Sequence, residues 1–478
     1  MSLFKKLILI LIAAVLSCMM LGGGAIADTA PDLDHLWTNQ AQWQLDTTGI
    51  GAGFGFHFPS MMWEGSEIWA YYIKHQTYGG TTRFAVGRAR STNGVNWTDD
   101  GYCLPAGGIW RWIYQAQTSM YHQIGRTDGD GWSANCAQDG SGWLCYGPYT
   151  NQMRVGPNDA GFHLMIDNNN ADNLVVAYID VYDATTGQVL AARNITRQEF
   201  TGTWTYQVFN LNFNVPGWNH LIEFRTYWYD RAYVKELSVA VAEGYYPHWD
   251  SFNSSFPGVV KNPADGMYYM VYEGSDGTSG SPGDIGLALS GDGMTFYRHA
   301  VNPILRHNTT GWERNNIGTP SIMKDGSTWW LYFHGFGPSG QGGPDDCQIG
   351  VATGTDLLNL SKYTYNPIVP TVASTWQSGT TGKRSTLLQS TISGLWYMAY
   401  EGSTDQPYGS AQWSTGIARS QDRVNWDRFS GNPIVPQTPF GYGFGNDGPE
   451  MIRIAGWTYL YVRSPYYGGC DRYKLVWK

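Results

Sequence analysis

Residues 256–275 read FPGVVKNPADGMYYMVYEGS, and residues 284–305 read DIGLALSGDGMTFYRHAVNPIL. In order, these stretches predict a short strand, a turn, an aromatic strand, a loop, an Ile-Gly-x-Ala strand, an Asp-Gly turn and a last aromatic strand. The same order returns, more or less completely, in four other stretches, which begin at residues 58, 319, 385 and 448. Five copies of a four-stranded unit predict an all-β protein with a five-bladed β-propeller.

The two ends of the chain are expected to meet in one blade. The last copy stops after its third strand, at Lys478. Residues 40–48, which read QAQWQLDTT, come before the first copy and are suited to supply the missing outer strand. Such an exchange closes the ring and leaves no free sheet edge.

The repeat is interrupted between the first and second copies. The runs LVVAYIDVYD, WTYQVFNLNF and NHLIEFRTYWY are longer alternating strands without the Ile-Gly-x-Ala signature. They predict a β-sandwich domain inserted between two blades. The expected organisation is a signal in residues 1–27, the first part of the propeller in 28–113, the inserted sandwich in 114–243 and the other four blades in 244–478.

The first 27 residues have the composition of an export signal. A short basic start with Lys5 and Lys6 precedes an apolar run from Leu7 to Leu16, and Ala25-Ile26-Ala27 is a small-residue cleavage site. An uncleaved anchor and lipidation at Cys18 are the alternatives. The protein is therefore expected to be secreted, or to lie at the cell surface or in the periplasm. Beyond such an anchor no membrane contact is expected, because no other segment is apolar enough to span a bilayer.

Export permits disulfide bonds. Removal of the signal leaves five cysteines, an odd number, without the CxxC spacing of a metal site. Cys136 and Cys145 flank a glycine-rich turn and are the expected pair.

The charge and the aromatic content narrow the class of partner. The net charge is −9, and 14% of the residues are charged while 15% are aromatic. Phosphate binding needs a basic stripe, so this composition argues against a nucleic-acid partner. Aromatic side chains are more often core, but on a weakly charged, exported protein they also suit the C–H faces of sugar rings. The expected partner is a carbohydrate, and the chain is expected to be a monomer.

The repeated units resemble the five-bladed propeller glycosidases, a group that includes families 43, 32, 68 and 130. The resemblance rests on x-Pro-Ser starts, on Gly-x-Tyr-Tyr/Trp strands and on the segments IGLALSGDGMTF and IGTPSI, and it covers the chain outside the insert. It implies a glycoside hydrolase in which a base, a general acid and a third carboxylate meet at the top of the central funnel. The alternatives are a non-catalytic glycan-binding propeller and, third, a phosphorylase.

This sequence departs from the motifs of that group. There the acids commonly stand in Asp-Pro and Glu-Gly-Pro sequences at the starts of inner strands. Here the residues before the inner-strand prolines are Phe58, Phe256 and Thr319. Only Asp447-Gly448-Pro449 echoes the second motif, with aspartate in place of glutamate.

Glycoside hydrolysis needs one protonated and one ionised carboxyl group beside the anomeric carbon. Alignment of the units places one residue of each second strand in a column at the funnel rim: Ile73, Glu273, His334, Glu401 and Arg463. Asp447 begins the fifth inner strand. We expect Asp447 to form the acid/base set with Glu401, Glu273 or both, although each glutamate also suits a structural role in the turn that follows it.

A second candidate pair is Asp250 and Glu313. Each follows a tryptophan and stands seven residues before an inner-strand proline. Equal placement also suits a repeated structural device at the start of a blade. The expected substrate-binding residues are His57, His334, Arg384, Arg463 and Glu450.

The insert resembles carbohydrate-binding sandwich modules that contain calcium, on the segments YQAQ, GRTDGDGW, YGPYT and LIEFRTYW among others. Those modules usually open with Tyr-x-Ala-Glu, and the glutamate holds the ion. Here that position is Gln117, which argues against a structural calcium. No cofactor and no catalytic metal are expected. The aromatic residues expected to offer a sugar platform, although several must be core, are Trp143, Tyr146, Tyr149, Trp218 and Trp228.

Overall fold

The computed structural model describes residues 29–278, 283–338, 345–404, 412–438 and 445–478. The predicted export signal and Cys18 lie outside these residues. Within them, helices are short, and none is both long and apolar enough to cross a membrane. The short helices are α2 (Asp34–Trp37) and α3 (Ala116–Ser119), and the 3₁₀ turns are η1 (Ala52–Phe54), η2 (Arg197–Glu199) and η3 (Gly311–Glu313).

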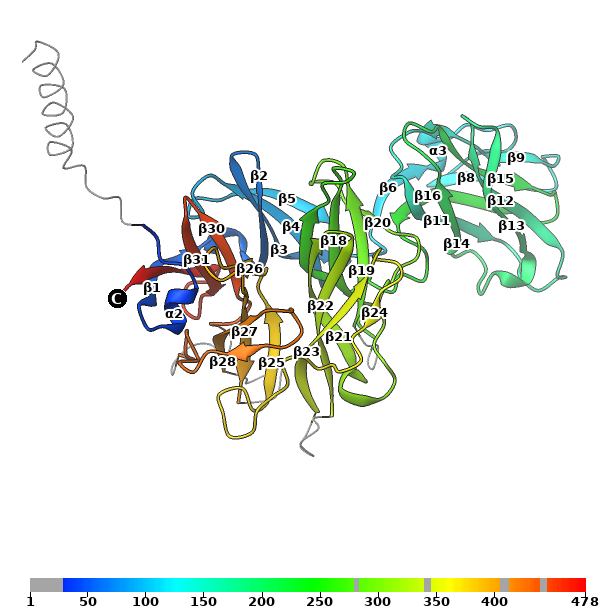
Figure 1. Cartoon of the computed structure of the whole chain (residues 1–478). Helices are drawn as coiled ribbons and strands as arrows, with labels where there is room; N and C mark the ends of the chain where they lie inside the picture. The colour runs from blue at the N-terminus through cyan, green and yellow to red at the C-terminus, as the bar shows by residue number, and fades with distance from the viewer. Residues whose placement is uncertain (1–28, 279–282, 339–344, 405–411, 439–444) are drawn as a thin grey trace, which may run out of the picture.

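Five antiparallel blades form the propeller (Figure 1). Blade 1 holds β2 (His57–Glu64), β3 (Glu67–Tyr78), β4 (Thr81–Ser91) and β5 (Thr98–Leu104). Blade 2 holds β17 (Asn253–Lys261), β18 (Tyr268–Ser275), β19 (Asp284–Ser290) and β20 (Tyr297–Arg298). Blade 3 holds β21 (Asn316–Asp325), β22 (Thr328–Pro338), β23 (Asp345–Gly354) and β24 (Ser361–Lys362). Blade 4 holds β25 (Thr380–Arg384), β26 (Leu388–Gln389), β27 (Trp396–Ser403), β28 (Trp413–Ser420) and β29 (Asp427–Arg428).

Blade 5 unites the two ends of the chain. It holds β30 (Glu450–Ile454), β31 (Trp457–Arg463), β32 (Cys470–Trp477) and, as its outer strand, β1 (Ala41–Ile50). β1 pairs antiparallel with β32, so that Ala41 lies opposite Trp477. The predicted exchange is therefore confirmed, and it closes the ring by covering an edge that would otherwise be free.

The second strand of each blade is buried on both of its faces. The residue just before each member of the sequence column is buried and apolar: Tyr72, Tyr272, Phe333, Tyr400 and Val462. Both faces of a blade pack against neighbouring blades, since Tyr71 and Tyr72, which point to opposite faces of β3, belong to different core clusters. The column residues line the cavity because they share one position along the second strands, where those strands pass the axis.

The insert is a β-sandwich that lies beside blades 1 and 2 (Figure 1). One sheet has the order β14 (Gln207–Val215), β11 (Gly156–Ile166), β16 (Val234–Glu243), β8 (Gly131–Ala134), β7 (Arg126–Asp128), with β6 (Trp110–Gln115) also on β16. The other has the order β10 (Pro148–Thr150), β15 (Ile222–Trp228), β12 (Val175–Asp183), β13 (Gln188–Thr196), with β9 (Gly142–Cys145) also on β15. The sheets share a core that includes Phe162, Phe224 and Trp228. The first of these strands, β6, starts at Trp110, ahead of residue 114, where the insert was expected to begin.

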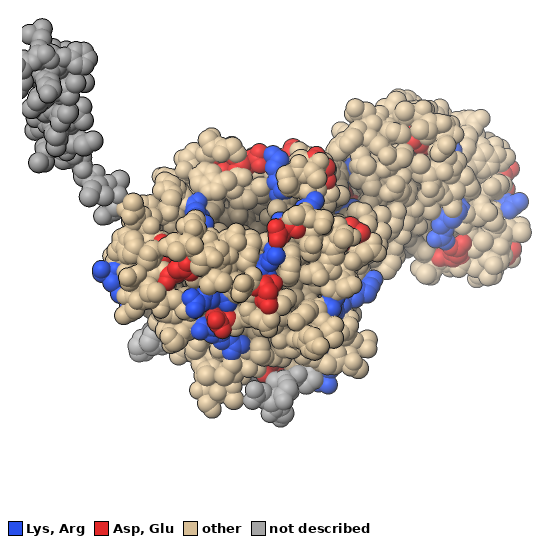
Figure 2. Space-filling view, in the orientation of Figure 1, with Lys and Arg blue, Asp and Glu red and all other residues tan. Residues whose placement is uncertain are grey.

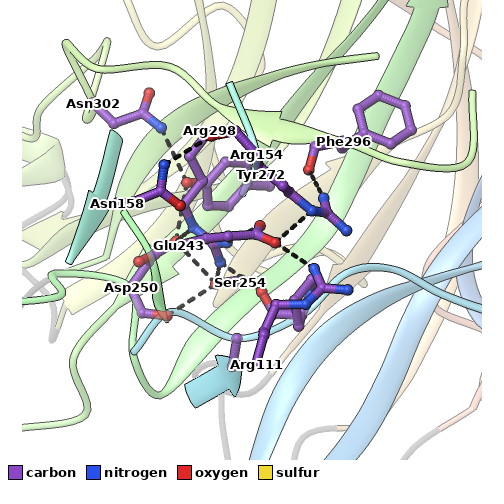
Figure 3. Close-up of polar contacts among 12 residues, drawn as sticks. Arg111, Arg154, Asn158, Glu243, Asp250, Ser254, Tyr272, Phe296, Arg298 and Asn302 are labelled. Carbon is purple, nitrogen blue, oxygen red and sulfur yellow. Dashed lines mark hydrogen bonds and ion pairs between the residues drawn. The ribbon is translucent and has the colours of Figure 1, made fainter. Parts of the chain in front are cut away.

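Buried ion pairs join the sandwich to the propeller (Figure 3). Glu243, the last residue of β16, binds Arg111 of β6 and, at 2.5 Å, Arg154. Arg298 of blade 2 lies 3.8 Å from the same carboxylate and bonds to Asp250 at 2.6 Å. The network joins the end of the insert to blade 2 through Arg298, and within it each buried charge has a partner of opposite sign.

The expected disulfide does not form. Cys145 is fully buried on β9, whereas Cys136 is exposed, and both are free. Burial raises the pKa of the Cys145 thiol, next to the carboxyl group of Glu236. Cys145 therefore behaves as a small apolar residue of the sandwich core.

Gln117 stands where the resembling modules have the glutamate that binds calcium. Its side-chain amide donates hydrogen bonds to the carbonyl oxygens of Gly129 and Gly131, at 2.9 and 2.8 Å. A calcium ion needs oxygen ligands, and here an amide N–H group binds the two carbonyls instead. These residues do not fit a calcium ion. Within the described residues there is also no group of three or more His, Cys, Asp or Glu side chains suited to a metal.

The visible surface carries charges of both signs. In Figure 2 lysine and arginine side chains are interspersed with aspartate and glutamate, and most of the surface in view is uncharged. A mixed surface of this kind does not steer a strongly charged partner toward one place.

Candidate active site

A cavity of about 340 Å³ lies where the five blades converge. All five members of the sequence column line it, as do residues at the starts of the inner strands. The lining residues are His57, Phe58, Ile73, His75, Phe84, Phe256, Glu273, Thr319, His334, Cys347, Thr380, Gly382, Glu401, Trp413, Asp447 and Arg463. The alignment of the repeats thus identified one ring of side chains around this cavity.

Glu401, near the end of β27, is a buried carboxyl group held between blades 4 and 5. It accepts hydrogen bonds from the backbone N–H of Lys383 at 2.9 Å and of Gly448 at 2.8 Å. Burial raises its pKa to about 7, and the nearby Asp447 carboxylate adds to the rise. A glutamate of this kind keeps its proton near neutral pH, which is what a general acid requires.

Asp447 is held differently from Glu401. Arg463 of β31 donates two parallel hydrogen bonds to its carboxylate, from Nε to Oδ1 at 2.8 Å and from Nη2 to Oδ2. Burial raises the pKa of Asp447, and the Arg463 guanidinium opposes that rise. The bidentate geometry favours the ionised carboxylate, because charge-assisted pairs of this type are strong.

Glu273 forms a second polar group between blades 2 and 3. Its carboxyl group accepts a hydrogen bond from the backbone N–H of Thr319 at 2.9 Å and from the side chain of Asn253 at 3.2 Å. Burial raises its pKa to about 7. The Thr319 hydroxyl lies 2.7 Å from Nδ1 of His334. Glu273 is therefore a second carboxyl group that can hold a proton near neutral pH.

Two histidines of the cavity are neutral. Burial lowers the pKa of His334 to about 4, and burial together with the charge of Arg463 lowers that of His57 to about 4. His57 Nε2 accepts a hydrogen bond from the backbone N–H of Gly469 at 3.1 Å. Among the described residues, Nε2 of His334 and Nε1 of Trp413 have no hydrogen-bond partner although both are buried. Buried polar atoms of this kind at a cavity suit a polar ligand or a water.

The residues before the inner-strand prolines also line the cavity. Phe58, Phe256 and Thr319 have φ angles of 51°, 50° and 41°, in the left-handed region. That conformation costs about 1–3 kcal/mol for such residues, and a following proline disfavours it further. The same strained position therefore recurs in three blades and directs a side chain toward the axis.

Two predicted substrate-binding residues lie outside the described cavity lining. Glu450 accepts backbone hydrogen bonds from Met61 at 3.1 Å and Thr386 at 2.9 Å, and so ties blades 1 and 4 to blade 5. Arg384 is buried with its guanidinium 3.9 Å from the centre of the Tyr332 ring, between blades 3 and 4. Both residues thus hold blades together rather than face the cavity.

The second candidate acid pair is also absent from the lining. Asp250 is buried, and besides Arg298 it accepts a hydrogen bond from the Tyr272 hydroxyl at 3.0 Å (Figure 3). Glu313, at the equivalent position of blade 3, is buried against Lys362. The structural alternative described for their equal placement fits these contacts, because each carboxylate braces the outer strand of its blade.

Sequence reasoning missed several lining residues. They stand at or near the start of the third strand of a blade, and not on the aligned second strands: Cys347 on β23, Phe84 on β4 and Trp413 on β28. Their place at the axis follows from the parallel contacts between blades, such as Cys347 opposite Thr380 and Phe84 opposite Asn253. The x-Pro positions carried the one available signal, since three blades repeat them.

A second polar surface lies on the outer face of the sandwich. Arg225 of β15 binds Asp180 of β12 with two hydrogen bonds, at 2.8 and 2.7 Å. Its guanidinium lies 3.9 Å from the centre of the Tyr182 ring and 4.9 Å from that of Trp143. We call Trp143, Asp180, Tyr182 and Arg225 the sandwich-face cluster.

The other residues of the expected platform lie elsewhere. Trp228 is fully buried in the sandwich core, and Trp218 makes an edge-to-face contact with Tyr297 of blade 2. Tyr146 and Tyr149 both pack on Tyr121. Of the expected platform residues, Trp143 is therefore the one that belongs to the sandwich-face cluster.

No protein-family profile and no curated protein matches the chain. Among solved structures, it is similar to a glycoside hydrolase at 13% identity, with a TM-score of 0.48 over 92% of this chain and 94% of that one. A thermostable family-43 glycoside hydrolase matches at 14% identity, with a TM-score of 0.43 over 90% and 91%. A family 117 glycoside hydrolase from the marine bacterium Zobellia galactanivorans matches at 11% identity, with a TM-score of 0.42 over 91% and 90%.

Proposed function

We propose that the chain is an exported glycoside hydrolase that acts on a polysaccharide or oligosaccharide of plant, algal or microbial origin in the cavity at the propeller axis. The observation that carries the proposal is the pair of buried carboxyl groups of Glu401 and Asp447. The pKa of Glu401 is raised to about 7, and Asp447 accepts two hydrogen bonds from Arg463. Two carboxyl groups with opposed protonation are what acid/base hydrolysis of a glycoside needs.

In the proposed reaction, Glu401 is the general acid and Asp447 the base. Glu401 gives its proton to the glycosidic oxygen as the bond from that oxygen to the anomeric carbon breaks. Water adds to the anomeric carbon, and Asp447 takes the proton that the water loses. Arg463 keeps Asp447 ionised before the water arrives, because it binds both carboxylate oxygens.

The remaining polar groups of the cavity suit substrate hydroxyls. Nε2 of His334 and Nε1 of Trp413 are buried without a partner among the described residues, and a sugar hydroxyl would satisfy either. Glu273, with its pKa raised to about 7, is the third carboxyl group and tunes the charge of the site. No cofactor is needed for these steps.

The test is a hydrolysis screen with reducing-end detection, followed by Asp447→Asn and Glu401→Gln. Each substitution keeps size and removes the titrating proton, so each should lower kcat about a hundredfold or more, the usual worth of general acid–base help. Glu67→Gln, at the partly exposed first residue of β3, is the control and should keep full activity. Full activity in both cavity variants would contradict the proposal.

The alternative is a non-catalytic glycan-binding propeller. The observation that favours it is the presence of Phe58 and Phe256 where the resemblance led us to expect Asp-Pro acids. This alternative predicts that a glycan binds the protein and is recovered uncleaved after long incubation. Cleavage that Glu401→Gln abolishes would rule it out.

A further inference from the structure

Part of the cavity lining is apolar and comes from blades 1 and 2. Phe58 and Phe256 meet edge to face, with ring centres 5.1 Å apart. Phe84 and Ile73 also line the cavity, and both come from blade 1. A sugar that fills the site must therefore place part of its surface against phenyl rings and an aliphatic side chain.

The backbone of the two phenylalanines is strained. Phe58 and Phe256 have φ angles of 51° and 50°, which bulky residues rarely adopt. The ring of Phe58 also packs on Gly448, where an added Cβ would come within 2.5 Å of Cδ1. Strained residues in a cavity point to a functional demand on their side chains, here an apolar surface next to the proposed base Asp447.

The charges of the lining are balanced within the site. Among the described lining residues, Arg463 is the one permanent cation, and it is paired with Asp447. His57 and His334 are neutral because their pKa values are lowered to about 4. A carboxylate, sulfate or phosphate on the substrate would meet three carboxyl groups and no uncommitted cation among these residues, so an anionic sugar is disfavoured.

We propose that the cavity selects a neutral 6-deoxy sugar, with Phe58 and Phe256 as the residues that determine this specificity. The inference rests on the proposed function and names its substrate class. A 6-deoxy sugar carries a methyl group where an ordinary hexose carries a hydroxymethyl group. The methyl group can lie on the phenyl rings while the ring hydroxyls face His334, Trp413 and the carboxyl groups.

The size of the effect follows from the cost of burying a hydroxyl group. Against an apolar wall, the hydroxyl of a hydroxymethyl group loses water and gains no partner. An apolar pocket rejects an added hydroxyl by about a hundredfold at most. We therefore expect the deoxy sugar to bind about 10 to 100 times more tightly than its hydroxymethyl counterpart.

The test measures equilibrium binding of free monosaccharides, which needs no turnover. Calorimetry or ligand-observed NMR would compare L-fucose with L-galactose, L-rhamnose with L-mannose and 6-deoxy-D-glucose with D-glucose, and D-galacturonate would represent acidic sugars. In at least one pair the deoxy member should bind at least about tenfold more tightly, and D-galacturonate should not bind. Equal binding within every pair, tighter binding of the hydroxymethyl or acidic sugar, or no binding of any deoxy sugar would overturn the proposal.

Variants of Phe256 test the role of the wall. Phe256→Tyr adds a hydroxyl and should reduce the preference for the deoxy sugar at least threefold, whereas Phe256→Leu should weaken binding of both members and keep the preference. Phe252→Tyr, the same change at a partly exposed residue outside the lining, should leave the preference unchanged. An unchanged preference in a folded Phe256→Tyr protein would contradict the assignment. If deoxy sugars bind but no deoxy glycoside is cleaved, the proposed hydrolase function fails while the binding specificity stands.

Discussion

At the scale of single residues, burial raises the pKa of both Glu401 and Asp447, and the groups that bind each carboxyl then distinguish the two. Burial and the neighbouring Asp447 carboxylate raise the pKa of Glu401 to about 7, although the two backbone N–H groups that it binds oppose the rise. Asp447 has the same burial but a bidentate arginine. The difference lies in the partner of each carboxyl group, and it assigns the proton to Glu401.

The pH dependence of turnover follows from that assignment. The acid must be protonated, so kcat/KM should fall as the pH rises through about 7, the pKa of Glu401. It should also fall at low pH, where Asp447 takes up a proton. A pH series of kcat/KM on the cleaved glycan measures both limbs.

Glu273 is the control for that profile, because its pKa is also raised to about 7. Glu273→Gln should lower activity modestly and keep the alkaline limb. If the limb disappears in Glu273→Gln, Glu273 is the acid and the roles of the two glutamates must be exchanged.

At the scale of elements, the sheet of β9, β15 and β12 offers a surface separate from the cavity. Asp180 lies opposite Arg225, and Tyr182 lies opposite Glu223, so these side chains share the outer face of the sheet. The alternate residues Ile179, Val181 and Phe224 lie in the sandwich core. A half-buried face that pairs aromatic rings with a fixed ion pair suits the flat side and the hydroxyls of a glycan.

We therefore expect the sandwich-face cluster to bind polysaccharide. In the full chain, Trp143→Ala should weaken retention in affinity electrophoresis against a polysaccharide about fivefold or more, since loss of one stacked ring is worth about 1 kcal/mol or more. Turnover of a small soluble glycoside should not change, because Trp143 does not line the cavity.

Trp204→Ala provides the matched control in the same domain, since Trp204 is exposed and packs on Tyr233 away from the cluster. Equal retention of the wild type and Trp143→Ala on every polysaccharide that binds would show that the sandwich acts as a spacer.

At the scale of the whole molecule, the ion pairs of Glu243 couple two bodies with separate cores. Arg111 and Arg154 come from the insert. Asp250 lies in the turn that precedes the first strand of blade 2, and Arg298 lies on the last strand of that blade. Arg154 also donates a hydrogen bond to the carbonyl oxygen of Phe296 in blade 2 at 2.5 Å. The junction in Figure 3 therefore holds the sandwich at a fixed place beside the propeller.

Glu243→Gln should weaken that junction. Loss of the carboxylate leaves the buried charge of Arg154 without its partner, while Arg298 keeps Asp250; breaking such a buried pair costs about 3–5 kcal/mol. We expect calorimetry to show two unfolding transitions in place of one, while each body keeps its own strands by circular dichroism. Glu64→Gln, which removes a partly exposed pair with Lys261 on blade 1, should leave a single transition. One unshifted transition in Glu243→Gln would show that the junction contributes little.

The sequence by itself determined the propeller, its closure and the ring of side chains around its axis. The repeat, the turns and the alternation of each strand are local properties, so a copy can be aligned with its neighbours without knowledge of the fold. For the same reason the sequence identifies the column from Ile73 to Arg463, whose five members line the cavity. The exchange of β1 could also be predicted, because a blade with three strands leaves an edge to cover.

Only the tertiary structure decided which of the candidate residues meet. Asp250, Glu313, Glu450 and Arg384 have the residue types of a site, but each one is turned toward a neighbouring strand or blade. The pairing of Glu401 with Asp447, and the phenyl wall beside it, depends on residues from different blades. Burial and the charge of such distant neighbours set a pKa, and neither can be read from a local pattern.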